Sequence, residues 1–323
     1  MRALVAGGAG FVGSHLCDAL IERGFEVICV DNLMTGHRQN VAHLMSHPHF
    51  EFLKHDVCKP LDLEADWVFQ LASPASPPQY QRHPVETLMV NAAGTQSLLD
   101  VATRSKGRFL LASTSEIYGD PEVHPQVETY RGSVSSTGLR SCYDEGKRFA
   151  EALTMAYLRA RSCDTRIVRI FNTYGPRLDP GDGRVMSNFL TQVLQEEPIT
   201  MYGSGEQTRS FCYVSDLVAG ILTVVESDNA RGEVINLGNP GEISLNVLRS
   251  ILERIVGHAI EVTWHPLPED DPRRRQPDIS KAKRLLGWEP KIPLEEGLRR
   301  TLDWYREALE QRGANSQAAV TRG

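Results

Sequence analysis

The sequence predicts an α/β fold in which helices cover both faces of a doubly wound parallel sheet, with a smaller, discontinuous C-terminal lobe. Short, fully apolar segments alternate with amphipathic segments through the first half of the chain. Strands buried on both faces of a parallel sheet form such continuous apolar runs. A glycine cluster at residues 7–13 joins the first apolar segment to the first amphipathic one, at the place where a doubly wound sheet passes from strand to helix.

The elements follow in order along the chain. Six apolar segments are expected to form the sheet: residues 4–6, 27–30, 50–53, 67–71, 109–112 and 166–170. Helical patterns cover residues 85–103, 142–160, 185–195, 245–256 and 294–309. We therefore expect a sheet domain at residues 1–175, which strands near 211–214 and 234–237 rejoin. The second lobe is expected at residues 176–313, followed by a flexible polar tail at residues 314–323.

Composition and charge argue against several classes of protein. Hydrophobic residues make up 41% of the chain, and the net charge of -6 gives no basis for binding nucleic acid or an anionic membrane. No apolar run approaches the roughly 20 residues that span a bilayer, and the glycine cluster leaves no room for a cleavable signal. The six cysteines are scattered without a C-x-x-C pair, so we expect reduced thiols, a cytoplasmic location and no metal site.

The glycine cluster has the features of a phosphate-binding turn. Gly7, Gly10 and Gly13 follow a strand and open a helix, where a backbone without side chains can approach a pyrophosphate at the positive helix N-terminus. Glycines alone also fit a plain turn. Asp31 at the end of the second strand strengthens the prediction, because a carboxylate there binds ribose hydroxyls and repels a 2′-phosphate. The pattern favours a Rossmann-type site for NAD rather than NADP.

A second group of residues points to acid–base chemistry. Tyr143 and Lys147 are spaced i, i+4, so they share one face of a helix. An ammonium beside a phenol favours the phenolate and is expected to lower the tyrosine pKa. The run of hydroxyl and carboxyl residues at 113–116 begins where a strand ends, and strand C-termini face the cofactor crevice in this architecture.

Together these residues resemble the extended short-chain dehydrogenase/reductase family, whose members act on nucleotide sugars. The resemblance covers nearly the whole chain and includes residues 171–177, 209–216 and 277–282. Four segments are similar to the UDP-glucuronate decarboxylases of that family: residues 71–78 (LASPASPP), 113–116 (STSE), 142–148 (CYDEGKR) and 182–185 (DGRV). Residues 131–140 depart from the pattern, because they lack the Trp, His, Asn and Pro usual before the catalytic tyrosine. This loop borders the sugar site, so the departure leaves sugar selectivity open.

The resemblance implies an NAD-dependent decarboxylation of UDP-glucuronate to UDP-xylose through a 4-keto intermediate, with the cofactor recycled. In this reaction Tyr143 is the base at the C4 hydroxyl, Lys147 its electrostatic partner and Glu116 a carboxylate near C5. The catalytic residues that the resemblance implies are Thr114, Ser115, Glu116, Tyr143, Lys147 and Arg275.

The resemblance also implies two sets of binding residues. Those expected to hold NAD are Gly7, Gly10, Phe11, Val12, Gly13, Asp31, Asn32, Thr35, Gly36, Asp56, Val57, Leu71, Ala72, Ser73, Asn91, Tyr143 and Lys147. Those expected to hold the UDP-sugar are Tyr80, Thr114, Arg140, Asn172, Arg177, Arg184, Tyr202, Gln207, Arg209 and Arg275. Arginine suits the diphosphate because its planar fork donates two hydrogen bonds to one phosphate group.

Two other functions stay open at this stage. A UDP-sugar 4-epimerase, acting on UDP-glucuronate, would use the same oxidation but usually lacks a carboxylate at position 116. An NAD-sensing protein on the same fold would typically lose the Tyr143–Lys147 pair. We also expect a homodimer through the helices at 85–103 and 142–160, because each carries more apolar positions than one sheet face needs.

Overall fold

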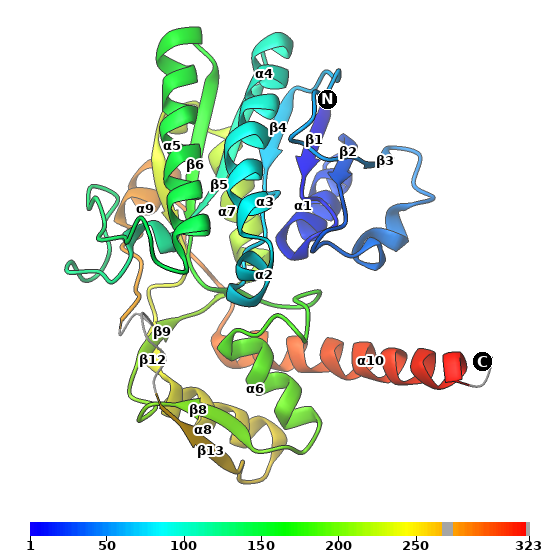
Figure 1. The fold of residues 1–323 in the computed structure, drawn as a ribbon, viewed down its shortest axis with the longest axis vertical. Coiled ribbons are helices and arrows are strands. Elements are labelled where there is room, and N and C mark those ends of the chain that lie inside the picture. The colour runs from blue at the N-terminus through cyan, green and yellow to red at the C-terminus, as the bar shows by residue number, and fades with distance from the viewer. Residues whose placement is uncertain (267–273, 321–323) are drawn as a thin grey trace.

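A seven-stranded parallel sheet forms the larger lobe of the computed structural model, which describes residues 1–266 and 274–320 (Figure 1). The strands lie in the order β11-β6-β5-β4-β1-β2-β3, and every pairing in the sheet is parallel. Their bounds are β1 Arg2–Ala6, β2 Glu26–Asp31, β3 Phe50–Lys54, β4 Trp67–Gln70, β5 Arg108–Thr114, β6 Asp164–Ile170 and β11 Val234–Leu237. The predicted doubly wound sheet is confirmed.

Helices cover both faces of this sheet because side chains alternate along each strand. In β1, Ala3 and Val5 point into a core that contains α1 (Phe11–Glu22) and α7 (Val214–Glu226), whereas Leu4 and Ala6 point into a second core. The second core contains α4 (Thr95–Ser105) and α5 (Ser141–Arg161). Two apolar cores therefore hold the sheet between two helical layers.

The helix expected at residues 85–103 contains a change of winding. It consists of α3 (Pro84–Met89), a π-helical turn η2 (Val90–Gly94) and α4. Within that turn the side-chain amide of Asn91 donates to Thr87 O at 2.8 Å and to Ser73 Oγ at 3.0 Å. Such turns are frequent at functional sites, and this one places Asn91 behind the loop that follows β4.

The smaller lobe lies at one end of the sheet (Figure 1). It contains two-stranded sheets formed by β8 with β13 and by β9 with β12. The bounds are α6 Val185–Leu194, β8 Ile199–Tyr202, β9 Thr208–Ser210, β12 Glu242–Ser244, α8 Leu245–Val256, β13 Val262–His265 and α10 Leu294–Val320. The remaining elements are α2 Pro77–Arg82, α9 Ser280–Leu286, β7 Thr173–Tyr174, β10 Cys212–Tyr213, and the short 3₁₀ helices η1 Arg38–Leu44, η3 Ser115–Tyr118 and η4 Asp228–Ala230.

Two expectations need correction. The segment at 211–214 does not rejoin the main sheet: β10 pairs with β7 in a separate two-stranded sheet, because β11 already occupies the edge beside β6. Residues 314–320, expected in a flexible tail, continue α10, since no proline interrupts a helix that is already nucleated. Residues 321–323 of that expected tail lie outside the described part of the chain.

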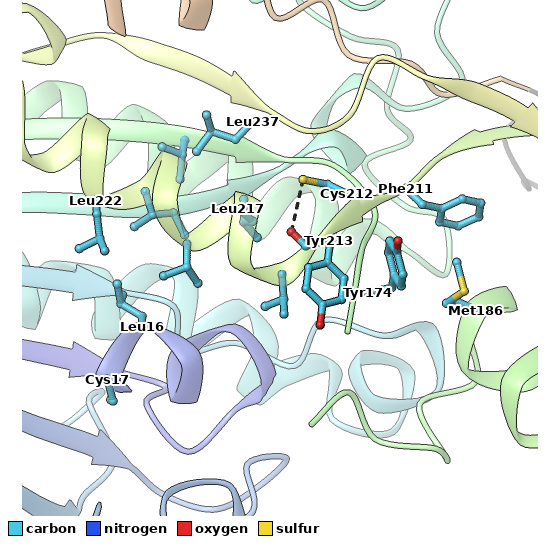
Figure 2. Close-up of a cluster of buried hydrophobic side chains, with 14 of the residues drawn as sticks. Leu16, Cys17, Tyr174, Met186, Phe211, Cys212, Tyr213, Leu217, Leu222 and Leu237 are labelled. Atoms are coloured by element: carbon cyan, nitrogen blue, oxygen red, sulfur yellow. Dashed lines mark hydrogen bonds between the residues drawn. The ribbon is translucent and has the colours of Figure 1, made fainter. Parts of the chain in front are cut away.

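The two lobes share one hydrophobic core. Figure 2 shows Leu16 of α1 and Leu217 of α7 in the same cluster as Tyr174, Phe211 and Met186. These five residues have relative exposures of 0% to 4%. Because this cluster runs from the sheet into α6, the smaller lobe is packed against the larger one and can hold a fixed site between them.

Candidate active site

Two adjoining cavities open at the C-terminal ends of the parallel strands. The smaller, of about 310 Å³, lies beside β2 and β4, and the larger, of about 630 Å³, extends between the sheet and the smaller lobe. Gly7, Gly10, Thr35, Leu71 and Ser73 line both cavities. Ligands of doubly wound sheets bind at this edge. The two cavities can therefore form two parts of one extended binding site.

The glycine turn leaves space that side chains would fill. Gly7 has a φ of +78°, and a Cβ there would lie 2.7 Å from Ala72 N. A Cβ on Gly13 would lie 2.1 Å from Gly7 O. α1 begins directly after Gly10, which leaves backbone N–H groups at the edge of the larger cavity. The turn therefore fits a pyrophosphate at a helix N-terminus.

Asp31 marks the ribose end of the smaller cavity. Its carboxylate accepts from Ala9 N at 3.0 Å and from Leu33 N at 2.8 Å, and burial raises its pKa although these hydrogen bonds oppose the shift. A Cβ on Gly36 would lie 2.7 Å from Asp31 Oδ2. The absence of a side chain at Gly36 thus leaves one side of the carboxylate open to a ligand hydroxyl.

The residues predicted to bind NAD are distributed over both cavities. Those lining the smaller cavity are Gly7, Gly10, Asp31, Asn32, Thr35, Gly36, Asp56, Val57, Leu71, Ala72 and Ser73. Those lining the larger one include Phe11, Val12, Gly13, Tyr143 and Lys147. Asn91 lines neither cavity and is fully buried, where it supports Ser73. The set fits a dinucleotide that extends from the smaller cavity into the larger one.

The Tyr143–Lys147 pair lies on the buried face of α5. Lys147 Nζ lies 5.9 Å from the centroid of the Tyr143 ring and donates to Ala112 O at 2.8 Å. Tyr80 stacks on Tyr143 with ring centroids 5.2 Å apart and an interplanar angle of 6°. The stacked ring of Tyr80 and the nearby ammonium of Lys147 hold the Tyr143 ring in one orientation.

The pKa of Tyr143 differs from the expectation. Burial raises the pKa of Tyr143. The hydrogen bond with the Thr114 side chain and the charge of Arg184 act in the opposite direction but do not reverse the shift. The expectation that the neighbouring Lys147 lowers this pKa is wrong for the protein without ligands. Removing a phenolate from water costs more free energy than the surrounding groups supply by stabilising it. Burial also lowers the pKa of Lys147 to about 8.

Glu116 lies between two arginines at the far side of the larger cavity. Its carboxylate accepts from the guanidinium groups of Arg140 and Arg275, and Arg275 also donates to Gly119 O at 3.1 Å. Burial lowers the pKa of Arg275, whose exposure is 4%, to about 10. Two cations thus converge on one carboxylate within the cavity that holds Tyr143.

The strand that carries these residues turns earlier than an extended strand would. β5 ends at Thr114, whose hydroxyl accepts from Glu116 N at 3.2 Å, and η3 begins at Ser115. The alternation of an extended segment, which would put Thr114 and Glu116 on one side and Ser115 on the other, does not apply. Because of the turn, all three residues line the larger cavity.

Basic and polar residues surround the far end of the larger cavity. The residues predicted for the UDP-sugar all line it: Tyr80, Thr114, Arg140, Asn172, Arg177, Arg184, Tyr202, Gln207, Arg209 and Arg275. Arg184 pairs with Asp182 at 2.5 Å and Arg177 with Asp18 at 2.7 Å. Tyr202 faces His265 with ring centroids 5.6 Å apart. Five of these ten residues are arginines, which suits a diphosphate.

Several lining residues were not predicted. In the smaller cavity they include His55, Val85 and Met89, and in the larger one Phe211 and Leu245. Val85 and Met89 are apolar residues four positions apart, and this i, i+4 spacing was the available signal in the sequence. Within residues 1–266 and 274–320, no three His, Cys, Asp or Glu side chains could together hold a metal ion.

A nucleotide turn and a tyrosine–lysine pair that open into one cavity are the arrangement of an NAD-dependent enzyme with a redox step. The chain belongs to the NAD dependent epimerase/dehydratase family, which matches residues 3–238. Its cofactor is NAD, in agreement with the fit of the glycine turn and Asp31.

Individual proteins are similar to this chain over nearly its whole length. The chain is 52% identical over 314 residues to UDP-glucuronic acid decarboxylase 1 of Xenopus tropicalis, covering 97% of this chain and 74% of the relative. It is 51% identical to UDP-glucuronic acid decarboxylase 2 of Arabidopsis thaliana, covering 99% and 72%. A solved structure of UDP-glucuronic acid 4-epimerase from Bacillus cereus, in complex with UDP-glucuronic acid and NAD, matches with a TM-score of 0.87 at 30% identity, covering 95% and 100%.

Proposed function

We propose that this chain catalyses the NAD-dependent decarboxylation of UDP-glucuronate to UDP-xylose. The observation that carries the proposal is the position of Glu116, which is held by Arg140 and Arg275 in the cavity that contains the Tyr143 hydroxyl. The high identity to decarboxylases over nearly the whole chain supports the same function.

The first step requires a base at the C4 hydroxyl of the sugar. Bound NAD supplies reversible hydride acceptance at C4. Tyr143 takes the hydroxyl proton, and the Lys147 ammonium, 5.9 Å from the ring centroid, stabilises the resulting phenolate. The Thr114 hydroxyl at the end of β5 is placed to hold the C4 oxygen toward Tyr143. The product of this step is a 4-ketone beside the C5 carboxylate.

The second step breaks the bond between C5 and the carboxyl carbon. The ketone makes this possible because the electron pair moves into an enolate while CO₂ leaves. Arg140 and Arg275 neutralise Glu116 in the protein by itself, and the same two cations can receive the sugar carboxylate. The enolate then takes a proton at C5. Glu116, a carboxylate between the two arginines, first takes this proton from solvent water and then passes it on. The Tyr143 phenol returns its proton to the C4 oxygen as the ketone is reduced.

The nucleotide half of the substrate fits the remaining part of the larger cavity. Arg184, Tyr202 and Arg209 come from three segments of the smaller lobe, and all three line the cavity. Their guanidinium groups can bind the two phosphates, while Asn172 and Gln207 offer amide groups to the uracil and ribose. We propose these residues, with Arg177, as the UDP site.

Three further properties complete the proposal. We propose residues 1–175 with β11 as the NAD-binding unit and residues 176–313 as most of the UDP-sugar unit. A cytoplasmic location is supported by the six free cysteines. A homodimer through α3 and α5 is supported by two exposed apolar side chains outside both cavities, Leu88 and Phe149, with exposures of 43% and 52%. No helix among the described residues has the length and apolarity needed to cross a membrane.

Incubation with UDP-glucuronate and NAD, followed by mass analysis of the sugar nucleotide, tests the function. Decarboxylation lowers the mass of the sugar nucleotide by one CO₂. A product of unchanged mass with inverted C4 would instead assign the chain as a UDP-glucuronate 4-epimerase. An unchanged substrate together with tight NAD binding would favour an NAD-sensing protein.

A further inference from the structure

A buried carboxylate lies one helical turn beyond the catalytic lysine. Glu151 follows Lys147 on the buried face of α5 at i+4 spacing. It accepts from Ser113 Oγ at 2.6 Å, from the Arg169 Nε at 3.0 Å and from the second Arg169 nitrogen at 2.8 Å. The side-chain exposures of Arg169 and Glu151 are 10% and 12%. No role in the reaction described above uses this pair.

Glu151 belongs to a set of contacts that joins α5 to the end of β5. Ala112 O accepts from Lys147 and the Ser113 hydroxyl donates to Glu151. The Thr114 side chain, next along the strand, hydrogen-bonds Tyr143. Consecutive strand residues thus engage the three polar residues of the helix face, so displacement of Glu151 would disturb the register of the other two.

We propose that Glu151 is a positioning residue of the active site, whose fixed carboxylate keeps Lys147 as an ammonium directed at Tyr143. The inference rests on the decarboxylase function proposed above, because that reaction is what requires the ammonium. Glu151 acts through Lys147 and does not line either cavity.

The electrostatic need for such a residue follows from burial. Burial lowers the pKa of Lys147 to about 8, and the negative charge of Glu151 opposes this shift. Without that charge the pKa of Lys147 falls further, since an ammonium in a site of low polarity loses its water without gaining an anion. The neutral amine could no longer stabilise a phenolate.

Arg169 explains why Glu151 does not draw Lys147 away from Tyr143. Both carboxylate oxygens are engaged by Arg169, and Oε1 also accepts from Ser113. Arg169 is itself fixed by Tyr118 OH and Glu128 O, each at 2.9 Å. The carboxylate therefore acts on Lys147 at a distance, and the lysine keeps its hydrogen bond to Ala112 O.

The charge balance around Lys147 includes groups from three elements. The titratable and charged side chains on the surrounding elements include Tyr143, Asp144 and Glu151 on α5, Arg169 on β6, and Glu116 and Tyr118 on η3. Of these, Glu151 is the one whose charge acts on the pKa of Lys147. Its removal is therefore the change to which the lysine should respond most.

Glu151→Gln tests the proposal, since it removes the charge and keeps the size of the side chain. We expect the alkaline limb of the kcat–pH profile to move down by about one pH unit, so that kcat falls about fivefold at pH 8 and about tenfold at pH 9, while KM for UDP-glucuronate stays within about twofold. A uniform loss of kcat at every pH, with an unmoved limb, would mean that Glu151 only supports the fold and would overturn the proposal.

Three further variants keep the test decisive. Glu151→Asp retains the charge and should keep the native alkaline limb even where it lowers the yield of folded protein. Asp164→Asn breaks another arginine pair of β6, with the buried Arg166, and should leave the limb in place. If Glu151→Gln does not fold, Glu151→Gln with Arg169→Gln removes both charges. A native limb in that double variant would contradict the proposal.

Lysine NMR separates this inference from the proposed function. In the NAD-bound protein with 13C-labelled lysine side chains, the resonance missing from Lys147→Met reports the titration of Lys147. A lower midpoint in Glu151→Gln supports the inference even if the wild-type protein fails to decarboxylate UDP-glucuronate. An unchanged midpoint refutes the inference even if the enzyme is fully active.

Discussion

The carboxylate of Glu116 accepts a hydrogen bond from the guanidinium of Arg275, although 159 residues separate the two in the chain. Glu116 follows the end of β5, whereas Arg275 lies shortly before α9, and both residues line the larger cavity. The ion pair therefore joins two distant segments of the chain inside this cavity. Because Arg275 is almost fully buried, whichever anion meets it, Glu116 or a substrate carboxylate, is held strongly.

Glu116→Gln is expected to separate the two chemical steps. The amide keeps the shape of the side chain but removes its charge and its capacity for proton transfer. Decarboxylation should slow by about 10² or more, while part of the bound NAD is still reduced in a single turnover, seen as NADH absorbance. Glu145→Gln, at a half-buried position on α5, is the matched control. Native decarboxylation by Glu116→Gln would make Glu116 a structural residue, and a complete lack of NAD reduction would place its action before C4 oxidation.

Tyr143→Phe should remove the base and leave the ring that stacks on Tyr80. We expect kcat to fall by about 10² to 10⁴, with binding of NAD and UDP nearly unchanged in calorimetry. Tyr130→Phe removes a phenol that lies outside both cavities and should have little effect on kcat. A near-native kcat for Tyr143→Phe would exclude this residue from the mechanism.

The reaction should proceed without net formation of NADH. The hydride taken from C4 returns to the same carbon after CO₂ has left, so the cofactor ends each cycle as it began. Continuous absorbance measurement during turnover, alongside a CO₂ assay, checks this. One NADH for each substrate consumed would identify a plain dehydrogenase.

Gly7→Ala should weaken NAD binding by at least about tenfold. The substitution adds backbone strain of about 1–2 kcal/mol at φ +78°, and its Cβ would meet Ala72 N at 2.7 Å. Gly24 has the same φ of +78° with no atom within 4 Å of the added Cβ, so Gly24→Ala is a control for the strain alone. Equal NAD affinity in the two variants would show that the close approach to Ala72 is unimportant.

Leu88→Glu combined with Phe149→Glu should give a monomer in sedimentation at micromolar concentration. Both side chains are exposed, at 43% and 52%, and two buried carboxylates would oppose the proposed contact between α3 and α5 of two copies. Leu98 and Leu99, which lie in the helical range 85–103 expected at the dimer contact, are fully buried in the chain's own core and do not contribute to it. Val247→Glu changes an exposed apolar residue on α8 and should leave the association unchanged. A monomeric wild-type protein would count against the dimer.

The sequence by itself determined the features that depend on short spacings. The apolar runs predicted the strands of the main sheet, and β5 and β6 extend little beyond the predicted ranges. The glycine turn with Asp31, and Tyr143 with Lys147, were also predicted, because a strand end and an i, i+4 pair are fixed by local backbone geometry. The resemblance to known enzymes added the substrate residues, which all line the larger cavity.

Tertiary structure alone decided the features that depend on burial and on distant segments. The direction of the Tyr143 pKa reverses the expectation, since the cost of desolvation depends on how closely the lobes pack around the ring. β10 pairs with β7 instead of the main sheet because β11, which follows it in sequence, occupies the available edge. The hydrogen bonds of Glu151 with Arg169 and of Glu116 with Arg275 join segments whose separation in the chain carries no periodic signal. Such contacts exist only once the sheet and the smaller lobe have packed together.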